Sequence, residues 1–174
     1  RKCRSSILHR ASFEVRAAAL REPDLYPDPR QTDTAPPRIA LTFKSAMTVD
    51  LGRRRVECIF FGKGHTGGDA VVWVQDANVM FAGDLVECGV APFWGEASFQ
   101  DWMQTLDEIT PYRPGVLVPG RGAPVHGHRE VEGAMVAQRD FVDRMWRIGS
   151  AAATGCENVI TVVNAMEELA PAAW

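Results

Sequence analysis

The sequence lacks the features that would place it in several large classes of protein. No apolar run approaches the about 18 residues of a membrane span. The net charge is -3, and no basic stretch with interleaved aromatics occurs, which argues against nucleic acid as a partner. Gly-X-Ser-X-Gly is also absent, so serine nucleophilic catalysis is not indicated.

Cysteine is scarce and scattered. The four cysteines form no Cys-X-X-Cys pair, and they are Cys3, Cys58, Cys88 and Cys156. This spacing favours free thiols in a reducing compartment over a disulfide framework. We therefore expect a cytoplasmic protein.

What is present is ordinary globular composition, with 46% hydrophobic and 24% charged residues in a chain of 174. That length is enough for one domain with a sizeable core. Residues 11–20 are rich in strong helix formers and predict a helix. Five of the eleven prolines fall within residues 21–37, which predicts an extended surface loop there.

A series of strands is predicted from Arg38 onward, because apolar and β-branched residues gather in short runs separated by turn residues. The predicted strands cover residues 38–43, 46–51, 55–61, 70–74 and 79–82. The last two are joined by Asp76, Ala77 and Asn78, which favour a tight turn. The pattern indicates an antiparallel meander with one buried face.

Helices follow the strands. Residues 99–109 carry apolar side chains at helical spacing, with Ser98 as a candidate N-cap. Residues 115–118 predict a short buried strand, and residues 130–148 and 157–169 predict two further helices. Strands followed by helices that cover one face are typical of a layered α/β domain.

Two candidate metal ligands lie at the ends of predicted strands. His65 sits in the glycine-rich segment 62–69, where a tight turn can aim an imidazole into a cleft. A glycine-rich hairpin with a solvent-exposed histidine would have the same sequence. Asp69 is placed to hold neighbouring groups by hydrogen bonds. Asp84 follows a buried run, so its carboxylate needs a metal, a helix N-terminus or an arginine.

A third segment, residues 119–125, ends the predicted strand at 115–118 and carries Arg121 between two glycines. An arginine stays protonated and cannot ligate a metal. Its guanidinium could pair with Asp84 or Asp69, or meet an anionic group of a substrate.

These three segments, in this order and at this spacing, resemble the second half of the metallo-β-lactamase superfamily. The motifs are Gly-His-Thr-Gly-Gly-Asp at 64–69, Phe-Ala-Gly-Asp at 81–84 and Val-Pro-Gly-X-Gly at 118–122. The resemblance is best over residues 46–125 and points to the glyoxalase-II-like branch. It implies an αββα sandwich, of which this chain forms mainly the second half, as a single partial domain over residues 1–174 with a helical part at 126–174.

The resemblance also implies a function. His65 would be the third histidine of the first metal site, and Asp84 would bridge two metal ions, for which we expect zinc. Members of the family use these ions to activate water for attack on an ester, thioester, lactone or lactam. We therefore expect a metal-dependent hydrolase that acts on a small-molecule substrate.

Two departures from the family pattern limit that expectation. The His-X-His-X-Asp-His motif is absent, and the final histidine ligand is replaced by Arg121. His126 and His128 lie past that position and are interpreted as surface histidines. Because the chain begins at Arg1 without a methionine, we expect a fragment or processed product whose first motif lies upstream. The alternative is a non-catalytic binding or assembly module that keeps the fold.

Half of such a fold would expose a sheet face that normally meets its partner. We therefore expect either a homodimer that buries this face or a chain of low stability.

Overall fold

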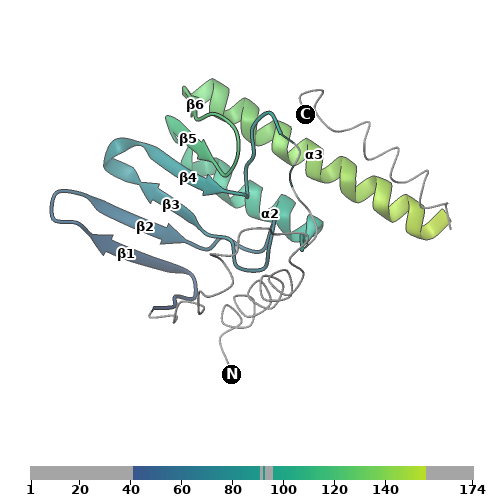
Figure 1. Cartoon of the computed structure of the whole chain (residues 1–174), viewed down its shortest axis with the longest axis horizontal. Coiled ribbons are helices and arrows are strands. Elements are labelled where there is room, and N and C mark those ends of the chain that lie inside the picture. Colours follow the sequence, from purple (N-terminus) through teal and green to yellow (C-terminus); the bar gives the residue numbers. More distant parts are fainter. Residues whose placement is uncertain (1–40, 91, 93–95, 156–174) are drawn as a thin grey trace, which may run out of the picture. The chain divides into compact units, whose positions relative to one another are not determined.

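The computed structural model describes residues 41–90, 92 and 96–155. Its strands form one sheet, with two long helices packed against it (Figure 1). The strands run in the order β1-β2-β3-β4-β5-β6 across the sheet. Their bounds are β1 (Ala46–Asp50), β2 (Arg55–Ile59), β3 (Val71–Val74), β4 (Val79–Gly83), β5 (Val116–Pro119) and β6 (Val125–His126). The helices are α2 (Phe99–Ile109) and α3 (His128–Gly155), with short 3-10 turns η2 (Gln75–Ala77) and η3 (Thr110–Tyr112).

The first four strands form the predicted antiparallel meander. The turn between β3 and β4 closes at Asn78, which adopts the left-handed conformation with a φ of 53°. Asparagine tolerates this conformation better than most residues. The Asn78 N–H donates to the carbonyl oxygen of Gln75 at 3.0 Å, which completes the tight turn expected there.

The pairing of β4 with β5 is parallel. A parallel pair requires a crossover connection, and here it runs through α2 and η3. The two strands therefore end at the same edge of the sheet, so the loops that follow Gly83 and Pro119 emerge side by side.

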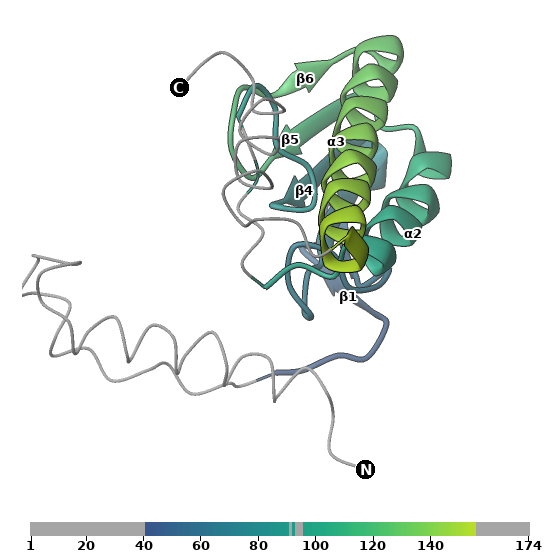
Figure 2. The same cartoon turned by 90° about the vertical axis from the view of Figure 1, so that its right-hand side faces the viewer.

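Helices α2 and α3 cover one face of this sheet (Figure 2). Alternate strand residues point toward them, as in Met80 and Ala82 of β4, because successive side chains of a strand face opposite ways. The buried core formed in this way contains Val71, Trp73, Met80, Ala82 and Leu117 from the strands with Trp102, Leu106, Ile109, Val131, Met135 and Val142 from the helices.

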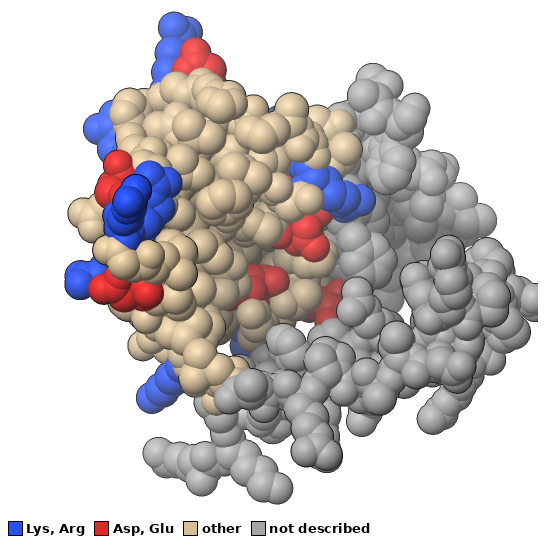
Figure 3. Space-filling view, turned by 60° about the vertical axis from the view of Figure 1, so that its left-hand side comes forward, with Lys and Arg blue, Asp and Glu red and all other residues tan. Residues whose placement is uncertain are grey.

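The opposite side of the sheet carries a row of apolar side chains. Cys58 pairs with Val72, Val72 with Phe81, and Phe81 with Val118, so the row crosses four strands. Phe81 is 45% exposed although it lies in a central strand. Figure 3 shows a face of the molecule with a wide uncharged area beside gathered acidic groups. The half-sandwich, the homodimer and the low stability remain predictions.

Several expectations from the sequence need correction. Residues 41–43 of the expected strand 38–43 are not a strand, and residues 38–40 lie outside the described part. The β1 edge pairs only with β2 among the described strands, so an alternating pattern at 41–43 finds no partner there. Ser98 occupies the N-cap position of α2, but its hydroxyl donates to the Asp101 carboxylate at 2.8 Å instead of capping a backbone N–H.

Other expectations are confirmed with small shifts. The predicted strands at 46–51, 70–74, 79–82 and 115–118 agree with observed strands to within one residue at each end, and the strand predicted at 55–61 ends at Ile59. Helix α3 extends beyond the predicted 130–148, and the strand β6 was not predicted. The helices expected at 11–20 and 157–169 and the loop at 21–37 lie outside the described residues. No helix in the described part of the chain is long and apolar enough to cross a membrane.

Truncating Ile109 tests the packing of α2 on the sheet. Its side chain is fully buried, so Ile109→Ala should lower the free energy of unfolding by about 2–5 kcal/mol, measured by urea denaturation. Val136→Ala is the matched control, because Val136 is 53% exposed and its loss should change stability by less than about 0.5 kcal/mol. Equal effects of the two substitutions would contradict the assigned packing.

The ion pair between α2 and α3 gives a pH-dependent prediction. Arg139 Nε and Nη2 donate to the Asp107 carboxylate at 2.6 and 3.0 Å, and these hydrogen bonds lower the pKa of Asp107 from its ordinary 3.8. A lowered pKa means that the pair stabilises the fold above pH 3.8 and that this contribution is lost as the pH falls below it. Asp107→Asn should thus destabilise slightly at neutral pH, by less than about 1 kcal/mol, and not in acid. Urea denaturation across this pH range measures the difference; Glu108→Gln, at the next exposed residue, should show no such loss.

Candidate metal centre

The loop between β2 and β3 holds His65 by close backbone packing. The Gly64 N–H donates to the Thr66 carbonyl at 2.9 Å, and the Gly64 carbonyl accepts from the Ser98 N–H at 2.9 Å. A Cβ at Gly64 would overlap Leu85 Cδ2. The absence of a side chain at Gly64 therefore lets the loop lie close against Leu85, beside His65.

The imidazole of His65 is packed against the core. Its side chain is only 12% exposed, and its ring meets that of Trp102 edge-on with centroids 5.8 Å apart. The Trp102 indole is itself fixed, because Nε1–H donates to the Leu85 carbonyl at 3.0 Å. The ring of His65 is therefore oriented by α2 as well as by its own loop.

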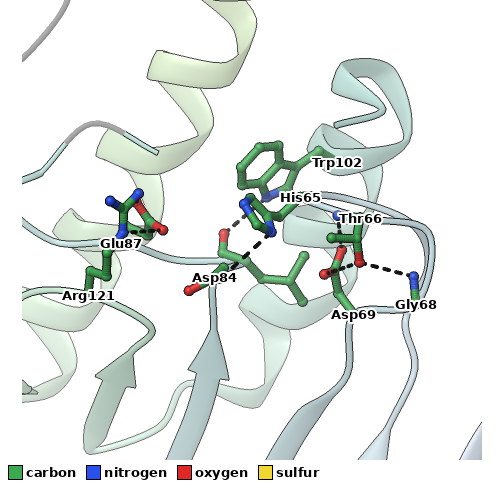
Figure 4. Close-up of polar contacts among 9 residues, drawn as sticks. His65, Thr66, Gly68, Asp69, Asp84, Glu87, Trp102 and Arg121 are labelled. Atoms are coloured by element: carbon green, nitrogen blue, oxygen red, sulfur yellow. Dashed lines mark hydrogen bonds and ion pairs between the residues drawn. The ribbon is translucent and has the colours of Figure 1, made fainter. Parts of the chain in front are cut away.

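The carboxylate of Asp84 faces the imidazole of His65. Asp84 follows Gly83, the last residue of β4, and its Oδ2 is 3.8 Å from His65 Nδ1 (Figure 4). The Asp84 side chain is 47% exposed, so the carboxylate is open to solvent. The two candidate ligands, which are separated by the whole β3–β4 hairpin in the sequence, come together at one edge of the sheet.

Gly120 supports Asp84 from the neighbouring loop. Its N–H donates to the carbonyls of Gly83 at 2.8 Å and Val86 at 3.1 Å. A Cβ at this position would overlap Asp84 Oδ1 and would lie 2.7 Å from the Asp84 backbone nitrogen. The loop after β5 thus fits against the loop after β4 only with glycine at position 120.

Asp69 holds the His65 loop in shape. Its carboxylate accepts from the Thr66 N–H at 2.8 Å and from the Thr66 hydroxyl at 2.7 Å (Figure 4). Burial raises the pKa of Asp69, while the hydrogen bonds from Thr66 and the charge of His65 oppose that rise and Asp84 adds to it. These contacts suit the supporting role predicted for Asp69.

Arg121 donates two hydrogen bonds to Glu87, whereas the sequence suggests Asp84, Asp69 or an anionic group of a substrate as its partner. Nε and Nη2 of Arg121 donate to the two carboxylate oxygens of Glu87 at 3.0 and 2.7 Å. These bonds raise the pKa of Arg121, with the charges of Glu87 and then Asp84 as smaller causes. Asp84 therefore contributes to the electrostatic surroundings of Arg121, and Glu87 accepts these two hydrogen bonds.

Glu87 was not identified from the sequence. Its side chain is fully buried, whereas that of Arg121 is 47% exposed. The Glu87 N–H donates to Gln138 Oε1 at 3.2 Å, and the Cys88 N–H donates to the Arg121 carbonyl at 3.0 Å. An available signal was a glutamate inside the apolar run 85–88, because a buried carboxylate requires a partner.

One group of possible metal ligands is found among the described residues: His65, Asp84 and Glu87, with one ligand atom of each lying within 4.8 Å of the others. One imidazole nitrogen and two carboxylate oxygens suit a divalent metal such as zinc. His126 in β6 and His128 at the start of α3 are exposed and lie outside this group, as predicted for surface histidines.

Comparisons with known proteins agree with this arrangement. A family model described as the metallo-beta-lactamase superfamily matches residues 13–121, which includes most of the best-matching part predicted at 46–125. Metallo-beta-lactamase type 2 of Bacteroides fragilis is 32% identical over 85 residues, covering 46% of this chain and 34% of that protein. Its counterpart from Elizabethkingia meningoseptica is 31% identical over 83 residues, covering 46% and 33%.

A solved metallo-beta-lactamase from Pontibacter korlensis has the same fold, with a TM-score of 0.52 at 22% identity. The alignment covers 60% of this chain and 48% of that one. The chain therefore spans about a third of the curated relatives that it matches and about half of this solved structure. The glyoxalase-II-like branch stays a prediction. Since the family model matches more than half of the 174 residues, the chain belongs to the metallo-β-lactamase superfamily.

Proposed function

We propose that this chain forms the carboxyl-terminal part of a zinc-dependent hydrolase that acts on an ester, thioester, lactone or lactam. The observation that carries the proposal is the convergence of His65 and Asp84, whose facing atoms are 3.8 Å apart. Both residues lie in loops that match the superfamily. Trp102 packs against His65 and Gly120 packs against Asp84, while the Asp84 carboxylate stays open to solvent.

The residues present fit a divalent metal ion. His65 offers a nitrogen ligand whose ring is fixed by Trp102, and Asp84 offers a half-exposed carboxylate that an ion can reach from solvent. A zinc ion bound there would act as a Lewis acid that polarises the carbonyl of the substrate. The chain's own part is to hold the ligands and keep their spacing.

Asp69 contributes to this chemistry through the loop and not through direct contact with a ligand group. By accepting two hydrogen bonds from Thr66, it fixes the backbone that leads from His65 into β3. Trp102 packs from α2 against the imidazole ring of His65 itself. The ligands are thus held by packed and hydrogen-bonded elements, which a site of defined geometry requires.

We further propose that the chain alone is inactive as a hydrolase. The His-X-His-X-Asp-His motif does not occur in its sequence, and Arg121 stands where the family has its final histidine ligand. Catalytic zinc sites usually have three protein ligands and an open position. His65 and Asp84 are the two family ligands that this chain provides.

The second candidate function is a non-catalytic binding or assembly module that keeps the fold. The observation in its favour is the bidentate ion pair between Arg121 and Glu87. It places an arginine in a ligand position together with its own buried counter-ion, so that the loop is stable without a metal at that position.

Zinc binding by the purified chain tests the proposal. We expect zinc to bind in a competition titration against a chromophoric chelator, and His65→Ala and Asp84→Asn to weaken binding at least tenfold, because each removes a ligand. His126→Ala is the matched control, since that exposed histidine lies outside the group. Unchanged binding in both ligand variants would refute the metal site, and binding by none of the proteins would favour the non-catalytic module.

Hydrolysis separates the two parts of the proposal. The zinc-loaded chain should leave a chromogenic thioester and a chromogenic lactam uncleaved. Turnover that is lost in Asp84→Asn would support the hydrolase and overturn the proposed inactivity of the isolated chain.

Gly120→Ala tests whether the close approach of the two loops positions Asp84. The new methyl group meets Asp84 Oδ1 and rigid backbone, so the two loops must separate. We expect a loss of about 1–3 kcal/mol in unfolding free energy and weaker zinc binding. Gly133→Ala in α3 is the control: its new Cβ meets no side chain and no other element within 4 Å, so zinc binding should be unchanged and stability should be equal or higher. Equal zinc affinity in both variants would contradict the role of Gly120.

A further inference from the structure

Glu87 occupies an unusual position for a residue of purely structural function. Its side chain is fully buried, yet it lies within the group formed by His65 and Asp84. We propose that Glu87 is a third metal ligand of this site and that Arg121 positions its carboxylate. This inference rests on the metal site proposed above and adds to it a ligand, an ion stoichiometry and a role for Arg121.

The spacing of the three groups is close to what a single ion needs. Zinc bonds to nitrogen and oxygen ligands are about 2.0–2.2 Å, so neighbouring ligand atoms in a tetrahedral site lie about 3.3–3.6 Å apart. His65 Nδ1 and Asp84 Oδ2 are 3.8 Å apart, and the group that includes Glu87 falls within 4.8 Å. Shifts on the order of 1 Å would therefore be needed to bring all three atoms onto one ion.

Arg121 leaves the Glu87 carboxylate able to bind a metal. An ionised carboxylate has about four lone-pair positions, and the two hydrogen bonds from Arg121 use two of them. The Glu87 backbone is tied to Gln138 through its N–H. The carboxylate is thus held in one orientation before an ion arrives, which lowers the conformational entropy lost on binding.

The local charges favour one divalent ion over two. Apart from Asp69, whose carboxylate is held by Thr66, the carboxylates of Asp84 and Glu87 and the guanidinium of Arg121 leave one net negative charge beside His65. A single divalent cation reverses that charge to one positive, whereas a second would add strong repulsion from both the first ion and the guanidinium. Arg121 therefore takes the electrostatic place of a second ion.

A second bidentate ion pair, between Arg139 and Asp107, lies outside the group of possible metal ligands and serves as a control. Arg139 also donates two hydrogen bonds to a carboxylate, that of Asp107, but this pair joins α2 to α3 and both side chains are exposed. Removing the Asp107 charge breaks an equivalent bidentate pair and leaves the metal group intact. It controls for the general cost of losing an arginine–carboxylate pair.

Zinc titration of the full chain tests the inference by stoichiometry and affinity. The wild-type chain should bind one equivalent of zinc. Glu87→Gln should weaken that binding at least tenfold, because the amide oxygen is a poorer ligand than the carboxylate, and Asp107→Asn should change it less than twofold. With Co²⁺ as a spectroscopic probe, the visible absorption of the bound ion should differ between wild type and Glu87→Gln and be unaltered in Asp107→Asn.

Equal zinc affinity of folded Glu87→Gln and wild type would overturn the inference, as would binding of two equivalents. If Glu87→Gln does not fold, Glu87→Asp keeps the charge but withdraws the carboxylate by one methylene; it should also bind zinc more weakly, and unchanged affinity would again overturn the inference. If His65→Ala and Asp84→Asn weaken binding and the Glu87 variants do not, the proposed metal site stands without Glu87. If none of these variants has an effect, the proposed site fails as well.

Discussion

The parallel pairing of β4 with β5 is the interaction on which the candidate site depends. It sets Met80 beside Leu117 and Gly83 beside Pro119, so both strands end at one edge. The loops that follow are then joined by backbone hydrogen bonds from Gly120 to Gly83 and Val86. Without this pairing, Asp84 and Arg121 would belong to separate parts of the molecule. The crossover through α2 is a requirement of the same pairing, and it also supplies Trp102 against His65.

A second constraint is the burial of Glu87. A carboxylate removed from water is costly unless it is paired and hydrogen-bonded, and Arg121 supplies both from the adjacent loop. The pair consequently ties the segment after β4 to the segment after β5 a second time. Asp84, by contrast, keeps half of its surface in water and needs no such partner. The two carboxylates of the site therefore differ in their surroundings: Glu87 is buried and held by Arg121, whereas Asp84 is open to solvent.

Much of the fold was predictable because its signals are local. The alternation of residues in β3 and β4 and the helical spacing in α2 fix which side chains face the core, and the structure places those elements within one residue of the predictions. The meeting of His65 and Asp84 followed from the order of the loops and their resemblance to a family. The Glu87–Arg121 pair could not be predicted in this way, because its partners are 34 positions apart and meet only through the parallel pairing. The strand expected over 38–43 failed at residues 41–43 for a related reason, since a strand needs a neighbour that a local pattern cannot supply.

The register of β4 connects the core, the open sheet face and the site. Met80 and Ala82 point toward the helices, Phe81 points the other way, and Gly83 leads directly into Asp84. Because side chains alternate along a strand, a shift of one residue would place Phe81 in the core and move Met80 to the apolar row on the other face. The same shift would carry Asp84 away from His65 and Gly120. The hydrophobic pattern of β4 thus fixes more than its packing: by making only one register favourable, it determines where the carboxylate of Asp84 stands relative to the imidazole across the sheet edge.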